Sequence, residues 1–219
     1  MKEGYIKKED RKKILLLTDD IRVHSGVAQI GRELVLHTLN KYNWCQMAGA
    51  VQHPEVGKVI DMSDEIKKQV PTAKDPYLML YPTTGYGDMQ ILRAVIKREK
   101  PDGILLITDP RYFSWLFQSE NEIRKECPIM YLNIWDNYPA PMYNKEYYES
   151  CDLLMGISKQ TVNINKLVLG DRGKNKIFKY VPHGLNSKIF GILDDDNPEL
   201  LRFKKNMGVA EDNNFHLLY

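Results

Sequence analysis

The sequence of 219 residues is poor in cysteine and has no long apolar run. Its three cysteines, Cys45, Cys127 and Cys151, are far apart, and no two of them have the spacing of metal ligands. We therefore expect buried thiols in a reducing compartment instead of a secreted disulfide framework. No apolar stretch approaches the roughly 20 residues needed to span a bilayer, and the N-terminus lacks the apolar segment of a signal peptide. These absences predict a cytoplasmic protein.

Common cofactor and nucleophile motifs are absent as well. The turn and helix after the first apolar run contain only Gly26 and Gly31, which is not a G-x-G-x-x-G fingerprint, and no G-x-x-x-x-G-K-[ST] loop is present. The sequence has no G-x-S-x-G elbow, and its histidines show no metal-ligand spacing. We therefore expect no metal, no bound cofactor and no covalent serine nucleophile.

The charge balance is close to neutral. A net charge of +2 is too small to indicate a nucleic-acid partner, and 43% apolar with 27% charged residues is ordinary for a globular chain. Basic residues gather near the N-terminus, where a frayed and solvated tail accounts for them. We assign residues 1–12 to this basic tail.

Apolar runs of strand length alternate with helical patterns along most of the chain. Strands are expected at 14–18, 44–51, 103–108, 129–134, 152–157 and 176–181, with shorter candidates at 59–62 and 77–81. Helices are expected at 29–39, 88–100, 112–125, 143–150 and 158–169. This alternation predicts an α/β fold with a doubly wound, Rossmann-like parallel sheet over residues 13–192.

The character of the sequence changes after this region. An acidic segment ending in proline, residues 194–198, precedes a helical pattern at 199–207 and a strand pattern at 214–219. A parallel α/β domain does not normally finish on a lone strand behind a linker. We therefore expect residues 193–219 to be a linker and the start of a second domain that is cut off.

A glycine turn follows the first predicted strand. The strand ends at Asp19 and Asp20, and the run Ser25-Gly26-Val27 then leads into a helix. A helix N-terminus offers free N–H groups and partial positive charge to a phosphate or carboxylate. The carboxylates at the strand end suit a sugar hydroxyl. A plain loop glycine and a helix-capping acidic pair are the alternatives.

Polar residues also follow the later strands. Asp109 comes after the strand at 103–108, and Asp136 and Asn137 come after the strand at 129–134. The carboxyl ends of neighbouring parallel strands converge on one crevice, so we expect these side chains near Asp19. The aromatic and proline-rich segment 138–143 suits either a wall that stacks on a sugar or base, or a packed loop.

The last predicted strand runs into Pro182-His183-Gly184. A lone histidine is seldom catalytic. This one lies where the main domain meets the linker, so we include His183 and Gly184 among the candidate substrate-binding residues.

In their order, these motifs resemble the N-terminal half of GT-B glycosyltransferases. The resemblance covers residues 12–190 and is strongest for the retaining family 4 group, which is related to glycogen synthase and sucrose synthase. It is carried by the glycine turn and by segments 101–105, 151–161 and 181–190. The group usually has Asn and Val where this chain has His183 and Leu185. Many members also have a histidine where this chain has Trp135-Asp136.

The resemblance implies two Rossmann-like domains, the first holding mainly the acceptor and the second mainly a nucleotide-sugar such as a UDP- or GDP-sugar. Transfer proceeds with retention and needs no bound metal. By position, Ser25, Gly26 and Val27 would approach the donor diphosphate, and Asp19 or Asp20 would contact the acceptor. Asp136, in place of the usual histidine, and Asp109 are the candidate catalytic residues.

The donor-binding motif of this group lies in the C-terminal domain, so we expect little activity from this chain alone. A non-catalytic binding module and a nucleotide-sugar epimerase-like enzyme are the alternatives. The acceptor is open among sugar, lipid, protein and modified nucleic acid. No helix sharply divides a basic from an apolar face, and peripheral membrane contact stays an open alternative.

Overall fold

The structure is a computed structural model that describes residues 4–184 and 191–208. The chain divides into two compact units, Met1–His183 and Gly184–Tyr219. The first unit contains all strands that the structure describes, and the second contains the helix α8 (Pro198–Asn206). The predicted strand at 214–219 and part of the 181–190 motif lie outside the described residues.

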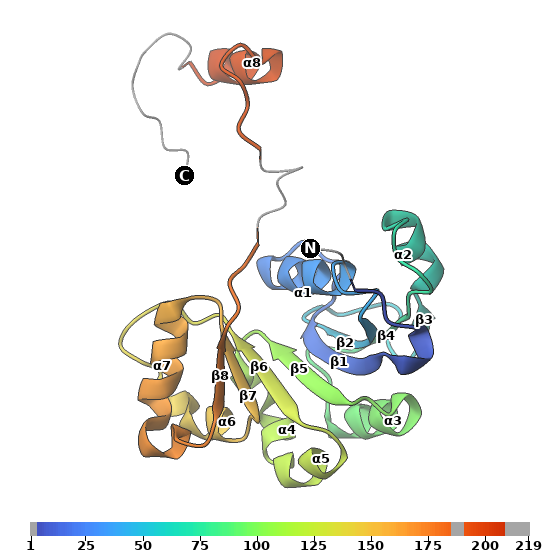
Figure 1. Cartoon of the computed structure of the whole chain (residues 1–219), viewed down its shortest axis with the longest axis vertical. Helices are drawn as coiled ribbons and strands as arrows, with labels where there is room; N and C mark the ends of the chain where they lie inside the picture. The colour runs from blue at the N-terminus through green and yellow to red at the C-terminus, as the bar shows by residue number, and fades with distance from the viewer. Residues whose placement is uncertain (1–3, 185–190, 209–219) are drawn as a thin grey trace. The chain divides into compact units, whose positions relative to one another are not determined.

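The first unit is built on one eight-stranded sheet with the order β3-β4-β2-β1-β5-β6-β7-β8. Every neighbouring pair is parallel except β3 and β4. Figure 1 shows the strands, which are β1 (Lys12–Asp19), β2 (Tyr42–Gly49), β3 (Ile60–Asp61), β4 (Leu78–Pro82), β5 (Gly103–Ile107), β6 (Ile129–Asn133), β7 (Leu153–Gly156) and β8 (Ile177–Tyr180). The prediction of a doubly wound parallel α/β sheet is confirmed.

Helices cover both faces of this sheet (Figure 1). One apolar cluster joins the sheet to α1 (Gly26–Leu36) and α2 (Ser63–Gln69). The other cluster joins it to helices on the opposite face, which are α3 (Met89–Glu99), α4 (Ser114–Phe117), α5 (Glu120–Glu126), α6 (Lys145–Glu149) and α7 (Lys159–Leu169). Leu16 and Leu17 of β1 point into different clusters, which is why β1 reads as an uninterrupted apolar run.

The strand order reverses between β1 and β5. From β1 the chain moves through α1 to β2 on one side, whereas β5 leads through α4 and α5 to β6 on the other side. In open α/β sheets such a reversal opens a crevice outside the carboxyl ends of the two strands, and ligands bind there. The β1–β5 boundary therefore positions the site described below.

Two local predictions differ from the structure. The helix expected at 112–125 is divided into a 3-10 turn at Pro110–Phe113 and the short helices α4 and α5, because the N–H of Ser119 bonds to the carbonyl of Leu116 and leaves the α-helical ladder. The helix α2 was not expected, since only Ile66 of its seven residues is buried and its apolar pattern is weak.

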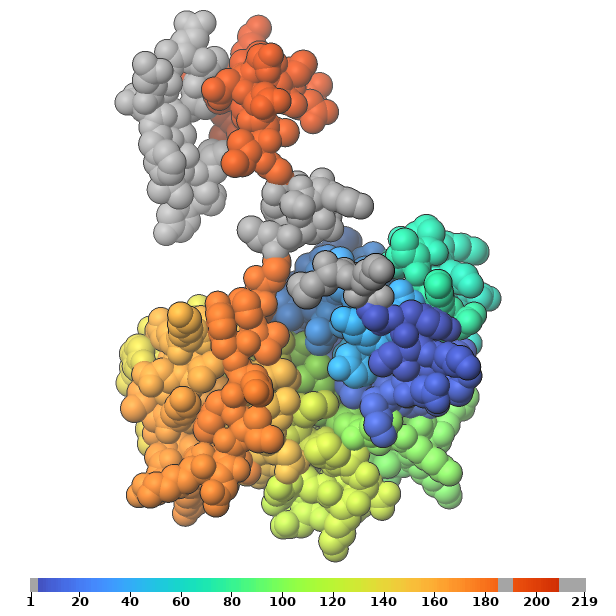
Figure 2. Space-filling model, in the orientation of Figure 1, coloured from blue at the N-terminus to red at the C-terminus, as the bar shows by residue number. Residues whose placement is uncertain are grey.

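Arg11 anchors the N-terminal segment and is buried, in contrast to the solvated residue expected there. Its guanidinium donates to three carbonyl oxygens, those of Ile6 at 2.8 Å, Lys74 at 2.7 Å and Asp75 at 2.9 Å. In Figure 2 the segment (dark blue) lies against the body of the domain. Arg11, which directly precedes β1, is thus packed into the domain and is not part of a solvated tail.

We predict that Arg11→Ala lowers the free energy of unfolding by about 2 kcal/mol, because hydrogen bonds to a charged donor are worth more than neutral ones. Urea denaturation measures this difference. The control is Lys7→Ala, an exposed residue of the same segment, which should change stability by less than about 0.5 kcal/mol. Equal effects of the two substitutions would contradict a specific anchoring role for Arg11.

The helix α8 lies within the described residues 191–208 of the second unit. Asn197 caps α8 by accepting from the N–H groups of Glu199 and Leu200 at 3.0 and 3.2 Å, and Pro198 occupies the first turn. The helix predicted at 199–207 is confirmed. Among the described residues, no helix combines the length and apolar character needed to cross a membrane.

Candidate active site

The sheet brings most of the predicted site residues to one edge. Asp19 ends β1, Asp109 follows β5 by two residues, and Asp136 and Asn137 follow β6. Because β1, β5 and β6 are parallel neighbours, their carboxyl ends share this edge. His183 follows β8, three places beyond β5 in the sheet order, and its side chain is exposed.

Asp19 is buried and both of its carboxylate oxygens accept hydrogen bonds. The hydroxyl of Ser25 donates to Oδ2 at 2.6 Å, and the hydroxyl of Tyr86 donates to Oδ1 at 2.9 Å. Burial, followed by this bond to Asp19, raises the pKa of Tyr86 well above its ordinary value, so Tyr86 stays a neutral donor. Asp19 therefore joins the glycine turn after β1 to the loop after β4.

Tyr86 is a site residue that the sequence did not identify. It lies in the run Thr83-Thr84-Gly85-Tyr86-Gly87, and both glycines have positive φ, 58° and 79°. Gly49 at the end of β2 makes room for this loop, because a Cβ atom there would lie 2.9 Å from the carbonyl oxygen of Gly85. The two closely spaced glycines were the available signal of a tight loop.

Asp20 lies apart from Asp19 and is fully buried. Its carboxylate accepts from the backbone N–H of Arg22 at 2.8 Å and from Nη2 of the same residue at 2.7 Å. Arg22 also donates to Glu55 at 3.1 Å, and His53 Nε2 lies 3.5 Å from Asp20. These contacts fold the loop after β1 back on itself. A substrate-binding role for Asp20 stays a prediction.

Ser25 caps α1, and its hydroxyl accepts from the N–H of Ala28 at 2.9 Å. The carbonyl of Ser25 accepts the first helical bond, from Gln29. The N–H groups of Gly26 and Val27 have no acceptor within the described residues, and the first turn of α1 has no acidic side chain. The positive end of this eleven-residue helix is thus open to an anion.

Asp109 forms a two-pronged ion pair with Arg111. Nε of Arg111 lies 2.9 Å from Oδ1 and Nη2 lies 2.5 Å from Oδ2. Burial by itself raises the pKa of Asp109, but the hydrogen bonds and charge of Arg111 outweigh it, so the pKa is below its ordinary value. The pair therefore holds Asp109 ionised and fixes the direction of Arg111.

The residue before this pair has an unusual backbone. Thr108 has a φ of 101°, which is rare for a β-branched side chain and concentrates at functional sites. Its carbonyl accepts from the buried hydroxyl of Tyr131 at 3.0 Å, which holds the turn in place. The turn at the end of β5 is therefore built at a conformational cost and directs Asp109 and Arg111 along the edge.

Asn133 supports the loop after β6 from inside the domain. It is buried, and its Oδ1 accepts from the N–H of Trp135 at 2.9 Å. Its amide nitrogen donates to the hydroxyl of Tyr148 at 2.9 Å and to Oδ1 of Asn165 at 2.6 Å. Beyond Trp135 the chain emerges to the surface, where Asp136 and Asn137 are exposed.

Aromatic rings line the same edge. The ring of Tyr112 stacks on that of Tyr86 with centroids 4.6 Å apart and planes inclined by 17°. The guanidinium of Arg111 lies 5.2 Å from the ring centroid of Tyr143, which in turn meets Trp135 edge to face at 6.1 Å. These contacts join the loop after β4 to the turn after β5, and that turn to the loop after β6.

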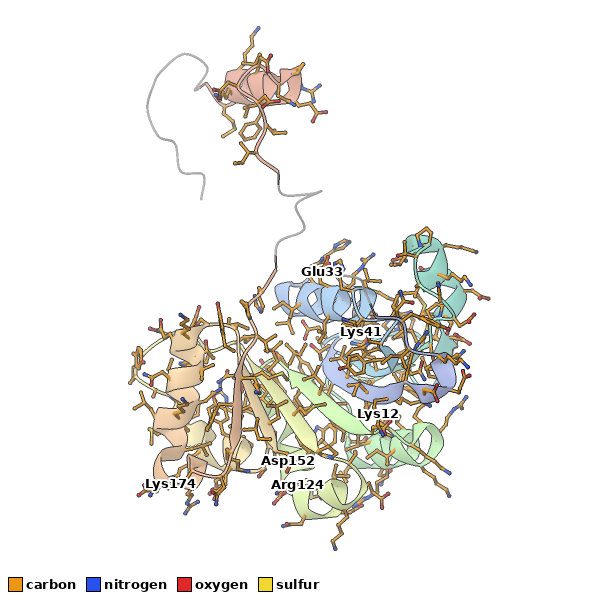
Figure 3. All side chains as sticks on the ribbon, in the orientation of Figure 1. Lys12, Glu33, Lys41, Arg124, Asp152 and Lys174 are labelled. Atoms are coloured by element: carbon orange, nitrogen blue, oxygen red, sulfur yellow. The ribbon has the colours of Figure 1, made fainter. Side chains whose placement is uncertain are left out.

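The amino edge of the sheet has a different character. There Arg124 of α5 reaches Asp152, just before β7, at 2.6 Å (Figure 3), and Lys12 pairs with Asp102 at 2.7 Å. Asp152 also accepts from the N–H of Ile129 at 2.9 Å. These pairs join chain segments to each other and account for the carboxylates at this edge. Within residues 4–184 and 191–208, no group of three His, Cys, Asp or Glu side chains could hold a metal.

Burial of the three cysteines is confirmed. Cys45, Cys127 and Cys151 are all free and buried in the first unit. Burial raises the pKa of Cys127 to about 11, and it also raises the pKa values of the other two thiols. The thiols stay protonated near neutral pH and pack as small apolar groups.

No family model and no curated protein matches this chain. Solved structures do match it, among them the following two. An E. coli trehalose-6-phosphate structure bound with UDP-2-fluoro glucose matches at 13% identity and a TM-score of 0.51, over 90% of this chain and 55% of that one. Medicago truncatula UGT71G1 complexed with UDP-glucose matches at 12% identity and a TM-score of 0.44, over 90% and 57%.

This chain therefore spans about half the length of the solved proteins that it matches. At this low identity the likeness is one of fold, and a strand order with one reversal is shared by many sheets of this class. The first of the two matches, together with the mostly parallel eight-stranded sheet covered by helices, shows that the chain has a GT-B-like α/β fold.

Proposed function

We propose that this chain is the acceptor-side domain of a glycosyltransferase that moves a sugar from a nucleotide-sugar to an acceptor with retention of configuration. The observation that carries the proposal is the open N-terminus of α1 at the strand-order reversal, where the N–H groups of Gly26 and Val27 suit a diphosphate. The GT-B-like fold supports it, since the E. coli neighbour is bound with UDP-2-fluoro glucose.

Each site residue has a definite task under this proposal. Ser25 holds the first turn of α1 and is itself held by Asp19, so the backbone donors are in position before the diphosphate arrives. Tyr86 keeps the other oxygen of Asp19 occupied. This arrangement costs no reorganisation when negative charge grows on the departing diphosphate.

The two candidate catalytic carboxylates differ in their surroundings. Asp109 is committed to Arg111 and acts in its ionised form, which suits orientation of Arg111 toward the substrate. The side chain of Asp136 is exposed at the end of β6 and is accessible to an acceptor hydroxyl. We therefore assign acceptor contact to Asp136 and a positioning role to Asp109.

The sharpest test places a negative charge at the first turn of α1. A Cβ atom at Gly26 would meet nothing within 4 Å, so Gly26→Asp fits sterically. An acidic residue in the first turn stabilises a helix by about 0.3–1 kcal/mol, yet it repels a phosphate. We predict that this variant melts no lower than the parent chain while its affinity for UDP, measured by calorimetry, falls at least about tenfold.

Two controls accompany this measurement. Gly26→Ala keeps the site neutral and should bind UDP as the parent does. Gln90→Asp adds the same charge to the first turn of α3, at an exposed position, and should leave UDP binding unchanged. If the parent chain binds none of UDP, UDP-glucose and GDP-mannose, the diphosphate-binding role of Gly26 and Val27 fails. Isomerisation of a nucleotide-sugar without acceptor would favour an epimerase instead.

A further inference from the structure

Four aromatic side chains and one arginine form what we call the aromatic rim, namely Tyr86, Tyr112, Trp135, Tyr143 and Arg111. Tyr112 and Tyr143 are 56% and 57% exposed, which is high for side chains of this size. Tyr112 lies in the turn after β5 that begins at Asp109, and Tyr143 lies in the 3-10 turn Met142–Asn144 of the connection after β6, seven residues beyond Asp136. Large exposed aromatic surface at the site edge requires an explanation.

The rim is held in place without a ligand. Tyr112 stacks on Tyr86, and the hydroxyl of Tyr86 is fixed by Asp19. Arg111 is fixed by Asp109 and lies over one side of the Tyr143 ring. Each exposed tyrosine therefore rests on a neighbour, and its remaining surface faces outward. A pre-ordered surface binds with a smaller loss of side-chain entropy.

The chemistry of the rim is mixed. Aromatic faces are electron-rich and attract positively polarised groups, which include the C–H face of a sugar ring. Nε and Nη2 of Arg111 donate to Asp109, and Nη1 has no hydrogen-bond partner within the described residues. Asp136 and Asn137 add exposed polar groups nearby in the chain. A sugar matches this alternation with one apolar face and a border of hydroxyls.

The high solvent exposure of the rim favours a sugar chain over a small apolar acceptor. Sites for small apolar molecules bury about 70–90% of the ligand surface, whereas two of the three rim tyrosines, Tyr112 and Tyr143, are more than half exposed. A groove of about 570 Å³ between α3 and α5 is lined by none of the rim residues. Hydroxyl-rich chains stay partly hydrated when bound, so an open surface suits them.

We propose that the aromatic rim binds a carbohydrate chain of several sugar units, with sugar rings against Tyr112 and Tyr143 and hydroxyls at Arg111. This inference rests on the proposed function and specifies its acceptor. Tyr112 and Tyr143 make no hydrogen bond to Asp19 or Ser25 within the described residues, whereas Tyr86 does. Substitutions at Tyr112 therefore affect glycan binding, and substitutions at Gly26 affect nucleotide binding.

Calorimetric titration of the chain with maltohexaose, cellohexaose, xylohexaose and chitohexaose tests the proposal. At least one hexaose should bind, and more tightly than its disaccharide, because longer chains reach both tyrosines. Tyr112→Ala should weaken that binding about tenfold, the effect of losing one aromatic stacking contact. Tyr112→Phe keeps the ring and should bind as the parent does. Tyr42→Ala, at an exposed tyrosine at the start of β2, is the matched control.

The outcomes separate this inference from the proposed function. UDP binding that persists while no hexaose binds would overturn the carbohydrate acceptor and leave the glycosyltransferase proposal standing. Tyr112-dependent glycan binding without any nucleotide binding would support the rim and contradict the diphosphate-binding role of Gly26 and Val27. Binding of 4-nitrophenol with the same Tyr112 dependence, and of no hexaose, would show that the rim takes an aromatic acceptor and overturn the inference. Unchanged circular dichroism and melting of Tyr112→Ala show that the variant is folded.

Discussion

Replacing Glu99 by alanine is expected to lower the free energy of unfolding by about 3 kcal/mol. Glu99 ends α3 and is only 4% exposed, yet it carries a charge. Its carboxylate accepts from Nζ of Lys13 at 2.8 Å and from the hydroxyl of Tyr77 at 2.7 Å, and it also accepts from the hydroxyl of Tyr81. Alanine would leave these three donors without their acceptor at the boundary of β1, β4 and α3.

Chemical denaturation of parent and variant measures this loss. Glu126→Ala is the matched control, because Glu126 is an exposed glutamate that also ends a helix. The control should change stability by less than about 0.5 kcal/mol. A loss below about 1 kcal/mol for Glu99→Ala would contradict the role that we assign to this network.

The same hydrogen-bond network makes the free energy of unfolding depend on pH. Burial by itself raises the pKa of Glu99, but the hydrogen bonds from Lys13, Tyr81 and Tyr77 together bring it below its ordinary value of 4.5. A group with a lowered folded pKa contributes stability above its unfolded pKa and loses it as the pH falls through the folded pKa. The stability difference between parent and Glu99→Ala should therefore be constant near neutral pH and shrink in acid below pH 4.5. A difference that grows on acidification would contradict this sign.

A second large loss is expected for Asn133→Ala, also about 3 kcal/mol. The amide of Asn133 is buried and bonds to the N–H of Trp135, the hydroxyl of Tyr148 and Oδ1 of Asn165. Its removal leaves the hydroxyl of Tyr148 on α6, the amide oxygen of Asn165 on α7 and the N–H of Trp135 in the loop after β6 without this partner, and each buried unpaired group costs about 1–3 kcal/mol. The loop that carries Asp136 also loses its attachment to β6.

Two measurements check the Asn133 prediction. Urea denaturation gives the stability loss, and Asn121→Ala, at an exposed position of α5, is the control. Hydrogen exchange of the Trp135 amide reports the loop itself, because this amide donates to Asn133 in the parent. A variant with parental stability and a protected Trp135 amide would show that neighbouring groups, not Asn133, hold the loop.

Local patterns in the sequence were sufficient for most elements of the domain. Asp88 and Ser158 are the first residues of the helices predicted at 88–100 and 158–169, and in the structure both side chains accept from N–H groups of the first turn of α3 and α7. Such caps are read reliably because the donor and acceptor lie within three residues of each other. The division of the 112–125 helix was not predicted, since it depends on packing between α4, α5 and the sheet.

The candidate site shows the same limit. The positions of Asp19, Ser25 and Asp109 at one sheet edge follow from their places after parallel strands. The roles of Tyr86 and Arg111 do not, because Tyr86 meets Asp19 across 67 residues of chain and Arg111 meets Tyr143 across two loops. No spacing rule in one sequence reports contacts of that range.

The sequence by itself determined a doubly wound parallel sheet, since buried strands and amphipathic helices alternate along it, and it placed the N-terminus of a helix after the loop that follows β1. Only the tertiary structure decided which groups each of the two carboxylates contacts. Asp19 and Asp20 are adjacent in the chain, but successive strand-end residues point to opposite sides, so one meets Ser25 and Tyr86 while the other is enclosed with Arg22. Long-range packing, which local pattern does not encode, is the physical reason for that difference.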